Sequence, residues 1–226
     1  MDQQAAEEAG RLIPLRPGLP PLPDRMAQLP KDHRGYPVPW FVAWVDGKPD
    51  FRIVDPAKMD QAIHHPICWL CGQHLDGDLV FVIGPMCAVN RTSSEPPSHP
   101  DCAAFAARAC PFLTMPKAER REGNLPQGMR PAAGFGLKRN PGVTLLWTCL
   151  AYRWLEDQNG RKLFQIGAPV RIEWLAEGRQ ATRAEVLESI NSGLPLLMAP
   201  AKQEGPRAVK HLQQLTEAAM ALVPAA

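Results

Sequence analysis

The sequence predicts an α+β protein with a cysteine-rich N-terminal half, followed by a small antiparallel β-meander and two C-terminal helices. Three observations predict this class. Five of the six cysteines lie between residues 68 and 110, short alternating apolar runs are separated by turn residues, and two helical patterns follow residue 182. The chain has 226 residues, which is enough to bury a core without obligatory cross-links.

Composition and charge restrict the classes of protein that fit. The formal net charge of +2 is too small to indicate a nucleic-acid partner by itself. No apolar run approaches the roughly 18 residues that span a bilayer, and the first residues lack the pattern of a signal peptide. We therefore predict a cytoplasmic protein without a membrane partner, in which closely spaced cysteines bind metal more often than they form disulfides.

The N-terminal region divides into an arm and a folded part. Residues 1–30 are rich in proline and predict an extended arm that gains order only by packing on something else. Residues 31–113 should hold a β-hairpin and a metal-binding domain. The hairpin strands are expected at 40–45 and 50–54, and Asp55 should then cap a helix that ends near His64.

The rest of the cysteine-rich region contains a predicted strand at 79–83 and an alanine-rich helix from about Asp101 to Cys110. Residues 114–142 follow as a connector with six lysines or arginines against two glutamates. A connector of this length is either functional or mobile, and it also marks a boundary between the two halves.

Residues 143–226 predict the meander and the two helices. Strands are expected at 143–155, 162–166 and 170–174. Asn159-Gly160 forms the turn between the first two strands.

The two helices have clear start signals. Thr182 and Glu185 form a capping-box pattern for a helix over 183–192, which Gly193 and Pro195 should end. Pro206 begins the last helix, which has one apolar stripe formed by Val209, Leu212, Leu215, Ala219 and Leu222.

Two pairs of candidate metal ligands stand out in the cysteine-rich region. Cys68 and Cys71 are separated by two residues, and His99 and Cys102 repeat that spacing after 27 intervening residues. Two such close pairs on separate elements can supply the tetrahedral site that zinc prefers. We predict a structural Zn²⁺ bound by these four residues.

Other ligand sets fit the same pattern. Either Cys87 or Cys110 can take the place of His99, and four of the five cysteines can hold an iron-sulfur cluster. A redox C-x-x-C motif is less well matched, because a thioredoxin-like strand and helix are missing around it.

The order of these motifs carries a resemblance. A glycine, Gly72, follows the first pair, as a tight knuckle turn requires, and the second pair lies at a predicted helix start. Knuckle, hairpin and ligand-bearing helix follow each other in this order in treble-clef zinc fingers, which residues 66–111 resemble. The resemblance implies a structural zinc and a role in presenting surfaces to a partner.

The whole chain also resembles proteins from phage and prophage genomes. The resemblance is carried by RGYPVPWF (34–41), CWLCG (68–72), FVIGPMCAVNR (81–91) and SEPPSHPDC (94–102). It implies a phage-related setting and no particular activity.

An enzyme is the alternative to a binding module. Treble clefs also form the core of HNH nucleases, which need a histidine at the end of the first hairpin strand; residues 79–84 contain none. A metal-dependent nuclease or other hydrolase would have its site in the loop 87–99. In that loop Arg91, Ser93 and Ser94 can bind an anion, or they can simply form turns.

The connector supplies the argument for nucleic acid. Its basic residues can neutralise phosphates, although a solvated linker has the same composition; the four central ones are Lys117, Arg120, Arg121 and Arg130. The sequence therefore predicts a zinc protein that binds nucleic acid or a protein partner.

Overall fold

The computed structural model describes residues 17–116, 118–119, 125, 140–157 and 160–225. Within them the chain is mixed α and β, and all the strand pairings are antiparallel. The helices are α2 (Asp24–Ala27), α3 (Pro56–His64), α4 (Pro85–Asn90), α5 (Pro100–Ala109), α6 (Pro111–Thr114), α7 (Arg183–Glu204) and α8 (Pro206–Met220). None of these described helices has both the length and the apolar character needed to cross a membrane.

Nine strands form three sheets in the described part of the chain. They are β1 (Val42–Val45), β2 (Lys48–Val54), β3 (Leu79–Ile83), β4 (Thr92–Ser93), β5 (Thr144–Cys149), β6 (Tyr152–Glu156), β7 (Lys162–Ile166), β8 (Pro169–Ala176) and β9 (Arg179–Gln180). The sheets have the strand orders β1-β2, β3-β5-β8-β9 and β4-β7-β6.

The predicted N-terminal hairpin is confirmed. Strands β1 and β2 pair directly, and the turn between them places Asp46 at φ 49° and Gly47 at φ 73°. Two positive φ values suit a short turn whose twist matches that of the strands. The helix α3 that follows begins as predicted, because the Asp55 side chain accepts a hydrogen bond from the Ala57 amide.

The prediction of a three-stranded meander is wrong. Residues 143–155 form two strands, β5 and β6, which are separated by Leu150 and Ala151. Strand β6 pairs with β7, whereas β5 pairs with β8, so that these four strands form one long hairpin with a bend. The bend brings Gly167 against Ala151, where an added Cβ would overlap the Ala151 carbonyl oxygen. The glycine therefore permits the close approach of the two bent strands.

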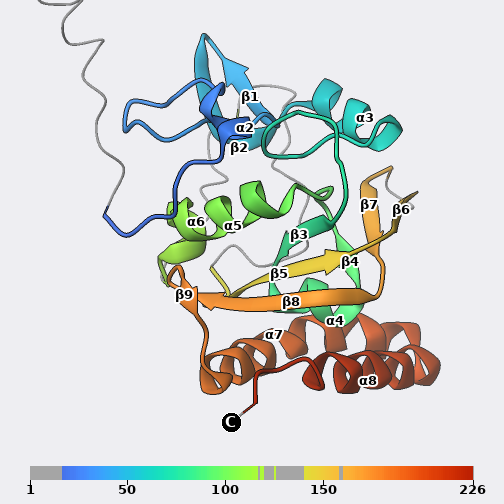
Figure 1. Ribbon diagram of the computed structural model, residues 1–226. Coiled ribbons are helices and arrows are strands. Elements are labelled where there is room, and N and C mark those ends of the chain that lie inside the picture. The colour runs from blue at the N-terminus through green and yellow to red at the C-terminus, as the bar shows by residue number, and fades with distance from the viewer. Residues whose placement is uncertain (1–16, 117, 120–124, 126–139, 158–159, 226) are drawn as a thin grey trace, which may run out of the picture.

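The sheet β3-β5-β8-β9 forms the centre of the molecule, with α5 over one face and α7 and α8 over the other (Figure 1). The face under α5 packs Val80, Leu146 and Leu175 against alanines of the helix. The opposite face contributes larger side chains to the main core, including Phe81, Leu145, Trp147 and Trp174, and these meet Val186 and Ile190 of α7.

This arrangement joins the two predicted halves. Strand β3 belongs to the cysteine-rich region and lies beside β5, the first strand after the connector. The pairing runs over the whole length of β3, from Leu79 opposite Cys149 to Ile83 opposite Leu145. Both regions therefore contribute strands to one core sheet, and the predicted domain boundaries remain predictions.

Helix α7 starts as predicted and ends later than predicted. The capping box is present, with Thr182 and Glu185 bonded reciprocally. The expected end near residue 192 is wrong, because the helix continues to Glu204 through Pro195 and Pro200. A proline inside a helix costs about 3 kcal/mol through its lost hydrogen bond and ring clash. Packing of the second half of α7 against α4 and α8 offsets this cost.

Replacing Gly167 with alanine tests the bend. We expect a loss of about 2 kcal/mol in the free energy of unfolding, because the added methyl group forces the two strands apart. Urea denaturation followed by tryptophan fluorescence measures it. Gly84→Ala is the control, since a Cβ there meets only Pro141 at 3.5 Å. Equal stability of the Gly167→Ala variant and the wild type would contradict the role of this glycine.

Candidate metal centre

Cys68 and Cys71 lie on a tight turn closed by backbone hydrogen bonds. The Cys68 amide donates to the Gln73 carbonyl at 2.7 Å, and the Gly72 amide donates to the Cys68 carbonyl at 2.9 Å. The Cys71 amide points at the Cys68 sulfur at 3.5 Å. Such amide contacts favour a thiolate over a neutral thiol.

Gly72 is required in this turn for two reasons. Its φ is +76°, a conformation that residues with a side chain rarely adopt. An added Cβ would also lie 2.6 Å from Cγ and 2.9 Å from Nε1 of Trp40, whose ring packs onto the turn. The amide of Trp40 in turn donates to the Leu70 carbonyl, so the turn and the segment before β1 hold each other in place.

His99 and Cys102 are positioned by the start of α5. His99 is the N-cap residue of that helix, Pro100 takes the first helical position, and Cys102 lies in the first turn. The helix N-terminus favours negative charge on the Cys102 sulfur. Ser98, just before the helix, forms a two-way backbone bridge with Val80 of β3, which fixes the helix start relative to the central sheet.

The four predicted ligands converge. One ligand atom from each of Cys68, Cys71, His99 and Cys102 lies within 4.8 Å of all the others. The Cys71 sulfur is 3.4 Å from His99 Nδ1. Neighbouring S and N ligands of a tetrahedral zinc ion lie about 3.5 to 3.8 Å apart, given bond lengths of about 2.3 and 2.0 Å. This cluster could therefore hold a metal ion with little rearrangement.

All four side chains are removed from solvent. Cys68 and Cys102 are fully buried, and the exposed fractions of His99 and Cys71 are 1% and 7%. Three thiols and an imidazole in one buried place provide the soft and borderline donors that zinc prefers. Since the protein itself supplies four donors, the arrangement fits a closed site without a position for substrate.

In the absence of a metal ion, the pKa values of the three cysteine thiols differ widely, so that negative charge is concentrated on one sulfur. The hydrogen bond from Cys102, with others from Cys71 and from the amides of Cys71 and His99, holds the pKa of Cys68 far below its usual range. The same contact with Cys68, together with Cys71 and burial, raises the pKa of Cys102. For Cys71 the hydrogen bond with Cys102 lowers the pKa, but Cys68 and burial outweigh it, and the pKa rises to about 11. A divalent cation would relieve the repulsion among three thiolates.

The outer side of His99 is held by polar groups that fix the ring. With Nδ1 facing the sulfurs, Nε2 lies 2.9 Å from the His74 carbonyl oxygen and 3.2 Å from Asp76 Oδ1. Both are acceptors for an Nε2–H, which leaves the Nδ1 lone pair for a metal. The Arg25 guanidinium holds the pKa of Asp76 below its usual value, so this acceptor is charged at neutral pH.

Cys87 and Cys110, the alternative ligands, lie outside the four-residue group. Cys87 is on α4 and packs against the main core. Cys110 follows the last residue of α5, eight residues after Cys102, which corresponds to a rise of about 12 Å along a helix.

The predicted anion-binding residues have other contacts. The Arg91 guanidinium lies over the Trp147 ring at 4.5 Å from its centre. The Ser93 hydroxyl donates to the Glu95 carbonyl and accepts from the Glu95 amide, which closes a turn, and Ser94 is half-buried beside it. Anion binding therefore stays a prediction. Four further predicted residues lie outside the described part of the chain: Lys117, Arg120, Arg121 and Arg130.

Asp76, His74 and Arg25 were not predicted from the sequence. Residues 74–77 follow the knuckle closely, so Asp76 gave only a weak indication of a carboxylate near a metal ligand. Arg25 had none, because it belongs to the arm that was expected to be extended. Its position depends on tertiary packing alone.

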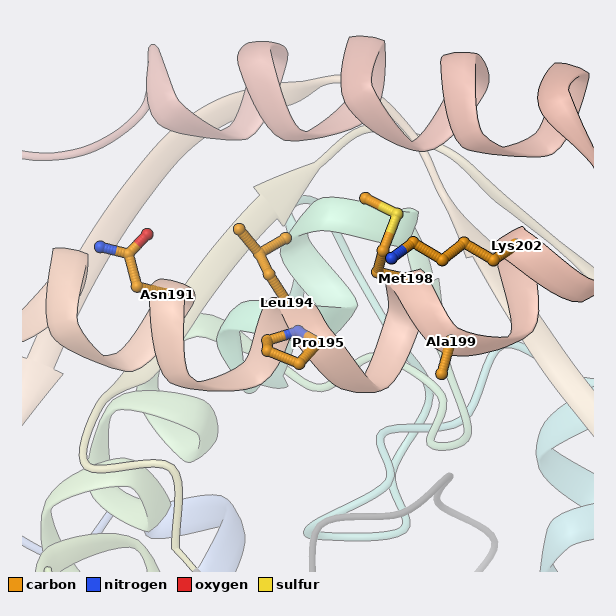
Figure 2. A pocket seen from close by; sticks show the side chains of 6 residues that line it. All are labelled: Asn191, Leu194, Pro195, Met198, Ala199 and Lys202. Atoms are coloured by element: carbon orange, nitrogen blue, oxygen red, sulfur yellow. The ribbon is translucent and has the colours of Figure 1, made fainter.

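A shallow apolar groove lies on α7, far along the chain from the cysteine cluster (Figure 2). Its volume is about 490 Å³, and its lining is formed by Asn191, Leu194, Pro195, Met198, Ala199 and Lys202. The lining contains no carboxylate, histidine or thiol, and so it lacks the groups of an acid-base or metal site.

No protein-family model, curated protein or solved structure matches this chain.

A pair of glycine variants tests the knuckle. Gly72 and Gly77 have nearly the same φ, +76° and +75°, but a Cβ at Gly77 meets nothing within 4 Å. We expect Gly77→Ala to cost about 1 kcal/mol from backbone strain, and Gly72→Ala about 3 kcal/mol because it also displaces Trp40. Thermal unfolding of the metal-loaded protein measures both. Equal costs for the two variants would show that the Trp40 contact is unimportant.

Proposed function

We propose that this chain is a zinc protein whose Cys68, Cys71, His99 and Cys102 bind a structural Zn²⁺, and that it acts as a module for binding nucleic acid or a protein partner. The observation that carries the proposal is the convergence of four buried donors within 4.8 Å. The fold thus brings together two pairs of donors that are separated by 27 residues in the sequence.

The donor set favours a structural role over a catalytic one. A catalytic zinc keeps one position for water or substrate and is rich in histidine, whereas four protein donors of which three are thiolates complete the coordination. The cluster is also embedded in apolar side chains, including Leu70, Leu75 and Phe105. Water has little access to such a site, so the metal would act by fixing the elements around it.

The resemblance to treble-clef fingers is part of this proposal. The knuckle turn is closed by a bridge between Ile67 and His74, and Val80 pairs with Ser98 directly before α5. Knuckle, antiparallel pair and ligand-bearing helix thus follow in the treble-clef order, with α4 and β4 inserted between Val80 and Ser98. In such a treble-clef arrangement the metal would fix the helix and the loops in position for contact with a partner.

Nucleic acid is the partner that the basic connector favours, and the phage-related setting rests on the resemblance of the sequence. The hydrolase alternative in the loop 87–99 stays a prediction. Within that loop, Ser93 serves a turn and Arg91 covers Trp147, and neither contact supports catalysis.

Elemental analysis of protein purified without chelator tests the zinc. We expect one zinc per chain and no iron. Cys68→Ser should lose the metal and unfold the region 66–113, because structural zinc binding and local folding are coupled. Cys110→Ser is the matched control and should keep one zinc per chain. Iron, absence of metal, or loss of zinc only in the Cys110 variant would contradict the assigned ligands.

Salt-dependent binding tests the partner. We expect single-stranded or duplex nucleic acid to bind at low salt, and substitution of Lys117, Arg120, Arg121 and Arg130 by glutamine to lower the slope of log K against log salt by about 3. Fluorescence anisotropy with labelled oligonucleotides measures the slope.

The control carries the same change in charge on exposed positions elsewhere, with glutamine at Arg171, Lys202, Arg207 and Lys210. It should bind like the wild type apart from a small general loss. Absence of association at low salt would remove nucleic acid as the partner and leave a protein partner.

A further inference from the structure

We propose that the metal centre also holds the N-terminal segment 17–30 in place, with Arg25 as the positioning residue that links metal binding to docking of this segment. The inference rests on the proposed function, because it assigns a regulated element to the same metal site. It predicts that the segment is docked when metal is bound and released when the metal is lost.

Arg25 contacts both ligand-bearing elements at once. Its Nη1 lies 3.2 Å from Asp76 Oδ1, in the turn that follows the knuckle, and its Nε lies 3.7 Å from Asp101 Oδ2, at the start of α5. Asp76 Oδ1 is also 3.2 Å from His99 Nε2 and accepts from both groups, so it joins the guanidinium to the ligand; Nη1 and Nε2 themselves, 2.8 Å apart, are both donors and do not bond to each other. The guanidinium can make these contacts only while the knuckle and α5 are held together.

Negative charges around Arg25 also favour the position of its guanidinium beside the metal centre. The guanidinium faces two carboxylates, Asp76 and Asp101, and Asp101 is the residue next to the ligand Cys102. A zinc ion with three thiolates carries a net negative charge, which adds to this attraction. Because the ion is bound by residues next to Asp76 and Asp101, it would strengthen the docking of Arg25 both by geometry and by charge.

Apolar packing of the segment depends on the same cluster. Met26, next to Arg25, is 2% exposed and packs in one cluster with Cys68, Cys71 and Cys102. Leucines on both sides of α2 pack against that cluster as well; they are Leu19, Leu22 and Leu29. The surface that receives the segment is therefore built largely from the metal-binding region.

The segment has little structure that could hold it without this support. Its only described helix, α2, has four residues and no side-chain cap. The backbone bonds of Met26, Ala27 and Leu29 are local, to Pro23 and Met26. A single helical turn is not stable in water by itself, so tertiary contacts decide whether the segment is ordered. By linkage, the factor by which bound metal strengthens docking equals the factor by which docking strengthens metal binding, so a variant that weakens docking of the metal-bound form also weakens metal binding.

Hydrogen exchange of the full-length protein tests the inference, with peptides that cover residues 18–30. In the wild type, removal of zinc by a chelator should raise the exchange rate of these amides to that of an unfolded chain. Arg25→Gln should keep one zinc per chain but raise their exchange about tenfold, and it should raise the dissociation constant for zinc by a similar factor in competition with a chromogenic chelator.

Arg34→Gln is the matched control. Arg34 lies in the same N-terminal part and pairs with Asp32, whereas Arg25 pairs with Asp76 and Asp101. It should leave both the exchange of residues 18–30 and the zinc affinity at wild-type values. Asp76→Asn is the second variant. It removes the carboxylate that pairs with Arg25, and it should reproduce the Arg25→Gln result.

The outcomes separate this inference from the proposed function. If Arg25→Gln holds one zinc and its segment 18–30 exchanges as slowly as in the wild type, the link is refuted and the zinc site stands. If removal of zinc leaves the segment protected, the link is refuted in the same way. If the wild-type protein binds no zinc at all, the proposed function fails and the inference fails with it.

Discussion

The burial of three thiols and one imidazole at a single point is the constraint on which the cysteine-rich region depends. Cys68, Cys71, Cys102 and His99 are almost without solvent contact, and their donor atoms face each other. Without a cation, the negative charge at Cys68 raises the pKa of both neighbouring sulfurs, so only a small charge can be held there. A divalent ion bound there would turn this mutual repulsion into attraction, and would thereby stabilise every element that carries one of the four residues.

Helix α5 transmits this constraint to the rest of the molecule. One side of the helix places Cys102, Phe105 and Ala109 in the cluster around the cysteines. Another side places Ala103 and Ala107 on the central sheet, against Val80, Leu146 and Leu175. Small alanines let the helix approach the sheet closely. The helix is therefore shared between the metal-binding cluster and the sheet, which would connect metal binding to the stability of the whole fold.

Local signals in the sequence predicted the parts that depend on neighbouring residues. The close ligand pairs follow from spacing, the caps at Asp55 and Thr182 from side-chain chemistry, and the first hairpin from Asp46-Gly47. The bend at Leu150 had no such signal, because residues 143–155 read as one apolar run. What breaks the run is the contact with Gly167, which is distant in sequence.

The remaining differences have the same origin in tertiary contacts. Pro195 is a correct stop signal for an isolated helix, but α7 continues because α4 and α8 pack against its second half. Arg25 becomes a neighbour of Asp76 and His99 only because the segment 17–30 packs on the cysteine cluster. Spacing could identify the four residues that converge, whereas the residues behind them required the structure.

Zinc K-edge X-ray absorption of the purified protein tests the proposed metal centre most directly. We predict three sulfur neighbours at about 2.3 Å and one imidazole nitrogen at about 2.0 Å, the ligand set of Cys68, Cys71, Cys102 and His99. His99→Ala should lose the nitrogen contribution. A spectrum with four sulfurs, with several oxygens or with iron in place of zinc would contradict the account.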